Sequence, residues 1–334
     1  RYVIIELEEI MKRIVLLLVC LLSLSMVFAA FDKNESDRLF YVENDYEADF
    51  AYLTKSLQSA VTNEEKAEIL WRMSRTRLTL TDENKERMTE DERLSAYGDY
   101  GANDKPKSGD TSSAFYYAYE SLKYYETPNA YHWKASAVGR AGQEHGALNS
   151  LGKADPMRKL ETKALEEFSS FPLETDSWYV LAILYRSLPG KPISFGSDNY
   201  AISYMRKCIM TQDTENRTNG TNFLELAEEL WNRDWDAKKR SKEFASMLKS
   251  WNKNQKSSYT EMNKYYEGYL ASQGSPFWVA ADLSTISDRQ EAIALLQYGI
   301  SVINYKLPKA SGSLAKEKME EEKAKLEAKL AEWN

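Results

Sequence analysis

Residues 178–185 read Trp-Tyr-Val-Leu-Ala-Ile-Leu-Tyr, and this stretch decides the fold. On a helix, one face of the stretch would carry Trp178, Leu181, Ala182 and Tyr185. Residues three and four positions apart are neighbours because a helix has about 3.6 residues per turn. The small alanine lets a second helix approach closely, while the two aromatic rings fill the space on either side of it. The stretch therefore predicts a helix that is packed between partner helices.

The same kind of helix recurs along the chain. Trp133 lies 45 residues before Trp178, and Phe223, which begins the similar stretch Phe-Leu-Glu-Leu-Ala-Glu-Glu-Leu, lies 45 residues after it. An earlier helix carries Trp71. The last three of these helices are each followed by a second segment of helical apolar spacing, the expected packing partner, at 157–168, 199–210 and 235–251. The Trp133 helix is expected to break into a loop that contains Gly139, Gly142 and Gly146.

A helix led by an aromatic residue and followed by a partner helix is the unit of the tetratricopeptide repeat (TPR), which buries its apolar face only by stacking on neighbours. The standard unit has about 34 residues, and the loop at 188–196 accounts for the longer spacing here. We expect an all-α, TPR-like superhelix, that is, an α-solenoid, with extra C-terminal helices. The positions expected to pack between repeats are Trp71, Trp133, Trp178, Leu181, Ala182, Tyr185, Ala201, Phe223, Leu226 and Ala227.

Residues 71–251 resemble a divergent TPR family that includes the regulator of microtubule dynamics proteins and the T-component proteins of bacterial tripartite (TRAP) transporters. The matching segments are Leu70-Trp71-Arg72, Trp133-Lys134-Ala135 with Gly139 and Gly146, Lys163-Ala164-Leu165, residues 178–185, the proline-broken loop and Tyr200-Ala201. These are packing motifs over a little over half of the chain, so they specify a fold better than an activity. The resemblance implies a periplasmic protein that docks a solute-binding protein.

The N-terminal residues indicate export. Met11-Lys12-Arg13, an apolar run from Ile14 to Phe28, and Ala29-Ala30 have the order of a secretory signal peptide. We expect cleavage after Ala29 or Ala30, a periplasmic or secreted product, and no stable membrane span after cleavage. The run could instead remain as an uncleaved anchor. Proteins of the TRAP-associated branch are usually lipoproteins, but Val19 before Cys20 departs from that processing site, so lipidation is the lesser alternative.

Composition narrows the class of protein. The 44 Lys and Arg against 51 Asp and Glu give a formal charge of −7, which argues against nucleic acid because a phosphate-binding surface needs a basic excess. Only 14 Gly and 8 Pro favour long helices over the many turns of a β-sandwich. Without the signal, Cys208 is the one cysteine; it cannot form an internal disulfide and is expected to be a small buried residue.

The chain divides into four expected parts: an N-terminal extension and signal at 1–30, a repeat domain at 31–255, capping helices at 256–311, and a charged helix at 312–334. The last helix has an apolar line, Leu326, Leu330 and Trp333. It could lie on the array, or it could join two copies of the chain, so a homo-oligomer stays open.

Nothing in the sequence forms a familiar reactive set. The chain has two histidines, and it lacks the HExxH, Cys–His, GxSxG, Walker A and GxGxxG patterns. We therefore expect a protein that is not an enzyme and has no cofactor or metal. The aromatic cluster Tyr116, Tyr117, Tyr119 and Tyr124 is the best candidate for a groove or cavity lining, although packing between repeats is the simpler interpretation of any one tyrosine. Weaker candidates for partner contact are Lys191, Phe195 and Asn199.

Three functional hypotheses follow. The favoured one is an exported scaffold or adaptor that binds a protein partner, for instance the periplasmic solute-binding protein of a TRAP-type transporter. The second is a periplasmic protein that holds a small apolar ligand inside the superhelix, which the density of tyrosine and tryptophan supports. The third is an envelope hydrolase whose acid and base groups converge only in the fold.

Overall fold

The computed structural model describes residues 31–98, 105–168, 174–214, 219–310 and 312–333, and every regular element in these ranges is a helix. The all-α class is thus confirmed. Residues 1–30, with the expected signal peptide and Cys20, lie outside the described ranges. None of the described helices is both long and apolar enough to cross a bilayer.

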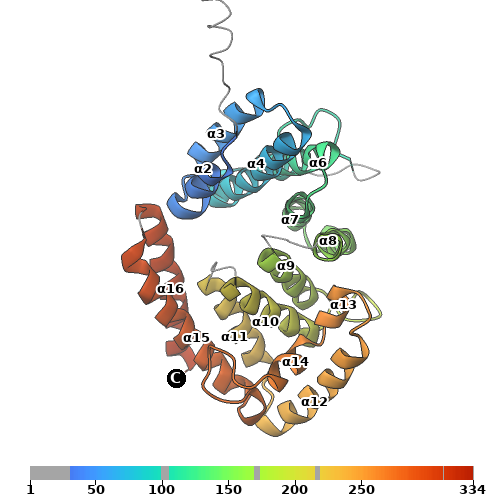
Figure 1. Cartoon of the computed structure of the whole chain (residues 1–334), viewed down its shortest axis with the longest axis vertical. Helices are drawn as coiled ribbons and strands as arrows, with labels where there is room; N and C mark the ends of the chain where they lie inside the picture. Colours follow the sequence, from blue (N-terminus) through green and yellow to red (C-terminus); the bar gives the residue numbers. More distant parts are fainter. Residues whose placement is uncertain (1–30, 99–104, 169–173, 215–218, 311, 334) are drawn as a thin grey trace, which may run out of the picture.

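The helices follow one another around a central space (Figure 1). The first half of the chain holds α2 (Lys33–Asp37), the π-helical turn η1 (Arg38–Glu43), α3 (Tyr46–Ser59), α4 (Asn63–Asn84), η2 (Lys85–Arg87), α5 (Glu90–Tyr97), α6 (Ala114–Tyr124), α7 (Pro128–Glu144), α8 (Ala147–Glu167), α9 (Glu174–Ser187) and α10 (Asp198–Thr214). The second half holds α11 (Gly220–Arg233), α12 (Ala237–Lys253), α13 (Tyr259–Asn263), α14 (Tyr266–Ser272), η3 (Leu283–Thr285), α15 (Asp288–Lys306), η4 (Leu307–Lys309) and α16 (Ser313–Trp333).

Most helices begin where a short polar side chain can satisfy the free N–H groups of the first turn. Thr62 accepts a hydrogen bond from the backbone N–H of Glu65 at 3.1 Å and so starts α4. Ser287 and Gln290 form a reciprocal capping box that starts α15. These local signals fix the helix boundaries before any tertiary packing is considered.

The glycines of the Trp133 helix do not break it. Helix α7 continues through Gly139 and Gly142 to Glu144, so the expected early end was wrong. The reason is close packing: a Cβ on Gly139 would lie 2.5 Å from the terminal methyl of Met157 on α8. Gly139 therefore marks a place where α7 and the flexible side chain of Met157 pack closely, and it does not end the helix.

In the first half, helix pairs form between near neighbours in the sequence: α4 with α6, α7 with α8, and α9 with α10. Helix α11 is different, because it packs chiefly on α15. The expected partner at 235–251, which is α12, packs on α14 instead. The ring of Phe223 meets Tyr298 of α15, with 5.4 Å between centroids. The α12–α14 contact depends on Gly268, where a Cβ would lie 2.5 Å from the backbone nitrogen of Leu248.

One large apolar core joins α9, α10, α11 and α15. It contains eight of the ten expected packing positions: Trp178, Leu181, Ala182, Tyr185, Ala201, Phe223, Leu226 and Ala227. Trp71 packs in a separate small cluster with Ala130, and Trp133 is only half-buried beside it. The Trp178 and Phe223 helices therefore share an environment that the Trp133 helix does not.

A buried ion cluster ties the C-terminal helices together. Its members are Arg206, Arg233, Arg240, Glu267, Asp288 and Glu291, three cations and three anions from α10, α11, α12, α14 and α15. The Glu291 carboxylate accepts hydrogen bonds from Arg206 at 2.5 and 2.7 Å and from Arg240 at 2.5 Å. Burial opposes ionisation of Glu291, but the two guanidinium groups prevail and lower its pKa to about 2.

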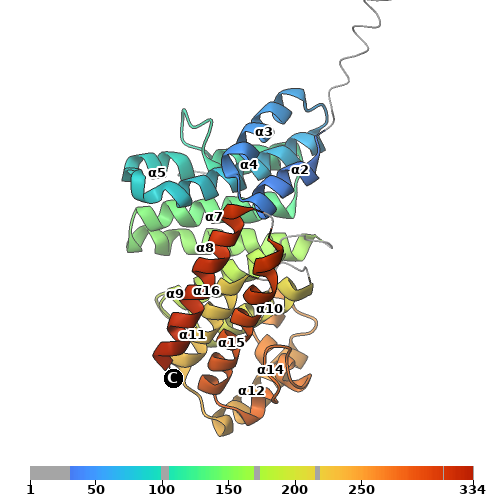
Figure 2. The same cartoon turned by 90° about the vertical axis from the view of Figure 1, so that its left-hand side faces the viewer.

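Helix α16 closes the space between the two ends of the helix stack (Figures 1 and 2). Its C-terminal part lies on α11 and α15, where the Trp333 ring stacks on Trp231 at 4.1 Å and Leu326 is buried. The apolar line of α16 thus packs within its own chain. At the other end, the Lys318 ammonium donates to the Tyr46 hydroxyl at 2.9 Å and pairs with Glu83 at 2.7 Å. We call this contact the seam; Lys318 and Tyr46 are 272 residues apart.

Candidate functional site

Two adjoining cavities lie inside this closed arrangement. The seam cavity, of about 1190 Å³, lies between the N-terminal helices α2 and α4 and the C-terminal helices α15 and α16. The inner cavity, of about 740 Å³, lies against α7, α8 and α9. Tyr41 of η1 and Asn219, the residue before α11, line both. The two cavities therefore meet at these side chains.

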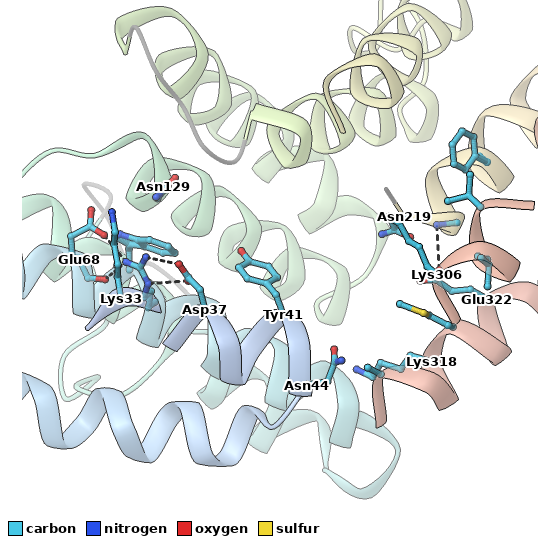
Figure 3. Close-up of a pocket in the computed structure, with 18 of the residues that line it drawn as sticks. Lys33, Asp37, Tyr41, Asn44, Glu68, Asn129, Asn219, Lys306, Lys318 and Glu322 are labelled. Atoms are coloured by element: carbon cyan, nitrogen blue, oxygen red, sulfur yellow. Dashed lines mark hydrogen bonds and ion pairs between the residues drawn. The ribbon is translucent and has the colours of Figure 1, made fainter. Parts of the chain in front are cut away.

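Figure 3 shows Asp37 and Glu68 on the N-terminal wall of the seam cavity, and Arg72 of the same wall pairs with both. The Arg72 guanidinium lies 4.1 Å above the ring of Trp71 and pairs with Asp37 at 3.2 Å and Glu68 at 2.5 Å. Burial disfavours the Asp37 carboxylate, but Arg72 and Arg75 together outweigh that effect, so the pKa of Asp37 is lowered. The charges of this wall are thus largely matched to one another.

Two buried polar atoms of this wall are not matched. The indole nitrogen of Trp71 and the side-chain oxygen of Asn129 have no hydrogen-bond partner among the described residues. Both residues line the seam cavity and are less than 8% exposed. A buried donor or acceptor left unpaired costs roughly 1–3 kcal/mol. Neither atom is exposed to solvent, so a bound group would pair with them only after the Trp71 and Asn129 side chains move.

The opposite wall is formed by the start of α11 and by α16. There the backbone N–H of Gly220 donates to Glu322 of α16 at 3.2 Å. A Cβ at position 220 would lie 2.9 Å from the side chains of Glu322 on α16 and Ile303 on α15, so a larger residue here would displace the ends of both. Burial raises the pKa of Glu322, and the Gly220 N–H acts in the opposite direction. The carboxylate of α16 thus serves as the anion at the positive end of helix α11.

The inner cavity has an apolar wall formed mainly by helix α9. Helix α9 presents Val180, Ile183 and Leu184 to it, and Met157 of α8 and Trp133 of α7 add to the wall. Polar side chains also line the cavity: Arg140, Lys153, Asp176 and Tyr179. Helix α9 thus has two apolar faces. One face enters the core and carries Trp178, Leu181, Ala182 and Tyr185. The adjacent face, with Val180, Ile183 and Leu184, lines the cavity.

A histidine, a glutamate and a serine converge at the wall of the inner cavity. The Nδ1 atom of His132 lies 3.1 Å from Glu161, and the hydroxyl of Ser177 donates to Glu161 at 2.5 Å. Burial raises the pKa of Glu161 despite the nearby imidazole. In a nucleophilic triad the serine and the acid bind opposite nitrogens of the imidazole. Here Ser177 lies 3.5 Å from the same Nδ1 and is fully buried, so this geometry ties α7, α8 and α9 together and does not present a nucleophile.

The tyrosine cluster on α6 lies away from both cavities. None of Tyr116, Tyr117, Tyr119 and Tyr124 is among the lining residues. Tyr117 meets the Phe50 ring at 6.0 Å, Tyr119 stacks on Phe115 at 6.4 Å, and Tyr124 is exposed beneath the Lys66 ammonium. These contacts are packing contacts of the outer helix layer.

The loop between α9 and α10 is divided between core and surface. The ring of Phe195 packs on Tyr185 at 5.0 Å, whereas Lys191 is exposed and Asn199 is half-buried at the start of α10. Leu188 and Pro189, at the start of the same loop, line the inner cavity. The sequence did carry a signal for the cavity: α9 is apolar on more of its circumference than one packing face needs.

Sequence and structure comparisons give no relative from which a role can be transferred. No protein-family model, no curated protein and no solved structure matches the chain. Within the described ranges, no group of three or more metal-ligating side chains comes together. The two cavities are therefore the structural features from which a function can be inferred.

Proposed function

We propose that this protein is a TPR-like helical-repeat binding protein without catalytic activity, and that it holds a small, largely apolar ligand with a polar end inside its closed helix stack. The observation that carries the proposal is the pair of adjoining cavities that meet at Tyr41 and Asn219. Ligand pockets are commonly about 300–1,000 Å³, mostly apolar, with few polar groups that fix the orientation. The inner cavity falls within that size range, and more of its lining surface is apolar than polar, although many polar side chains contribute to it.

The polar end of the ligand would point toward the seam cavity. The unpaired Trp71 and Asn129 atoms lie there, as do the charged groups around Arg72. Helix α16 covers the space in which an open repeat array would accept an extended peptide. A compact molecule therefore suits this space better than a long protein segment.

The test is binding of cis-parinaric acid, a fluorescent fatty acid, together with mass spectrometry of natively purified protein. Replacing Ile183 by Trp would fill the inner cavity, and we expect at least a tenfold loss of probe binding. The matched control is Ile193→Trp, because Ile193 is 75% exposed in the α9–α10 loop. A wild-type protein that carries no ligand and binds no probe would contradict the proposal.

A protein-adaptor role, including the docking of a periplasmic solute-binding protein, is the second candidate. It is supported by the exposed side chains of Ile193 and Lys191 on a loop that begins at the wall of the inner cavity. Cross-linking in periplasmic extract should then give one recurrent partner, and the double variant Ile193→Asp, Lys191→Glu should lose it. If the variant is cross-linked as well as the wild type, the loop is not the contact.

Export of the chain is part of the same proposal, because a periplasmic binding protein needs a signal. The apolar run before Ala29-Ala30 supports it. Intact-mass measurement of protein from the periplasmic fraction should give a product that begins at Ala30 or Phe31. A product that keeps the run, or that carries lipid on Cys20, would replace this version with an anchored one.

A further inference from the structure

A row of lysines occupies the outer face of α12. Lys238, Lys242, Lys249 and Lys253 are all exposed, and at about 100° per residue they fall within about 60° of one another around the helix axis. The row is about 22 Å long at about 1.5 Å per residue. Within the described part of the chain, none of the four makes an ion pair.

The rest of this face contains no acid and no large apolar side chain. The residues between the lysines are Ser241, Ala245, Ser246 and Asn252, all exposed. The apolar side of α12, with Phe244, Met247 and Trp251, is buried in the protein. The face is thus a straight, hydrophilic, positively charged strip on a chain whose formal charge is −7.

We propose that this strip docks the protein on an anionic lipid surface. Protein partners usually bind through a few aromatic or aliphatic anchors in a core depleted of charge, and the strip offers none. A charged membrane needs no such anchors, because each lysine near anionic headgroups contributes separately. Helix α12 lies at one extremity of the molecule in both views, so the strip can meet a flat surface (Figures 1 and 2).

Because the chain as a whole is negatively charged, we expect it to bind the surface in one orientation, with α12 toward the lipid. Most of the molecule is repelled by an anionic surface, and only the α12 end is attracted. The apolar residues of α12 face inward, so binding would be peripheral and would weaken as salt screens the charges over about 10 Å. The cavities and the strip lie on different elements, so this inference does not depend on the proposed ligand.

The experiment is sedimentation of the full protein with vesicles of equal parts phosphatidylglycerol and phosphatidylcholine, and with pure phosphatidylcholine vesicles as reference. The test variant changes all four row lysines to Gln. The matched control changes four exposed lysines on other segments to Gln and so has the same net charge: Lys55, Lys85, Lys105 and Lys316.

We expect the wild type to bind the anionic vesicles and to be released at high salt. At roughly fivefold per lysine, the row variant should lose at least a hundredfold in affinity, while the scattered control should lose only a fewfold. Lys249→Glu is a second variant with a single change, and it should lose roughly 25-fold. Circular dichroism should show unchanged helix content in all variants.

Three outcomes would overturn the inference. Failure of the wild type to bind anionic vesicles at low salt is the first, and equal losses in the row variant and the scattered control are the second. The third is retention of the wild type on a polyglutamate column, but not on vesicles, with loss in the row variant; an acidic protein would then be the partner of the strip.

Discussion

The two halves of the molecule pair their helices by different rules. Residues 31–214 form pairs between near neighbours in the chain, whereas residues 219–333 place α11 on α15, with α12, α13 and α14 in between. Short connections make neighbour pairing the ordinary outcome. The distant pairing coincides with the buried cluster of three arginines and three acids. Buried charges occur in both halves, since Arg75 of α4 also pairs with Asp49 of α3, but the cluster in the second half draws its members from five helices. We infer that this cluster helps to specify the distant pair, which apolar spacing alone does not distinguish from a neighbour pair.

Breaking the ion cluster should have the largest effect. Glu291→Ala leaves Arg206 and Arg240 buried without their shared anion, and loss of one partner from such a cluster costs about 3–5 kcal/mol. The free energy of unfolding in urea should fall by that amount. Arg289→Ala, which breaks the exposed pair with Asp234, is the control and should cost less than about 1 kcal/mol. Similar costs for the two variants would mean that the cluster does not specify the second half.

Trp133 and Trp178, which the sequence makes look equivalent, should differ in their contribution to the free energy of unfolding. Trp178 is completely buried against Tyr204 and Tyr259, so Trp178→Ala should cost about 3–4 kcal/mol. Trp133 is half-buried at the inner cavity, so Trp133→Ala should cost about 1 kcal/mol in the free energy of unfolding and act mainly on probe binding. If the two variants lose the same free energy of unfolding, Trp133 and Trp178 are equivalent, as their 45-residue spacing suggested.

The boundary between the halves should respond to pH through Glu229 of α11. Burial raises its pKa to about 8, although Arg186 of α9 lies 3.6 Å away and opposes the shift. Since the ordinary value is 4.5, the folded state keeps the carboxyl neutral and loses stability as pH rises from about 4.5 to about 8. Glu229→Gln should therefore match the wild type below pH 4.5 and exceed its free energy of unfolding by about 3 kcal/mol at pH 7, since each pH unit above 4.5 adds about 1.4 kcal/mol to the difference. An advantage that does not change with pH would contradict this assignment.

Loosening the seam should have the smallest effect on stability. Lys318→Met removes contacts with Tyr46 and Glu83 that are partly exposed, at a cost of about 1 kcal/mol or less. Hydrogen exchange should nevertheless rise at 38–46 and 313–318, with no change in α9 and α10. Uniformly faster exchange would mean that the seam supports the whole fold.

The sequence predicted the parts of the fold that depend on local signals. The all-α class followed from apolar spacing, and the pairing of the Trp178 helix with the segment 199–210 followed from the repeated order of an aromatic-led helix and a partner helix. The α11–α15 pair could not be predicted, because the segment after Phe223 has equally good helical spacing and only the tertiary contacts choose between the two. Gly139 was misread since close packing and helix breaking use the same residue type.

The candidate site was harder to predict for a related reason. Val180 and Ile183 line the inner cavity, but in the sequence they resemble further core positions of the same helix. The tyrosine cluster drew attention by its density, yet side chains such as Tyr117 lie on α6 and line neither cavity. A cavity arises from how distant helices curve around a space, and no single stretch of sequence records that curvature.

The seam also makes one contact, between Lys318 and Tyr46, depend on the packing of all the helices between them. The hydrogen bond between Lys318 and Tyr46 joins residues that are 272 positions apart, so it forms only when the intervening helices pack in this arrangement. A change in how these helices pack can therefore alter this one contact. A ligand that changes the packing of the helices around a cavity would in this way change the contact at the seam, without a separate hinge or lid.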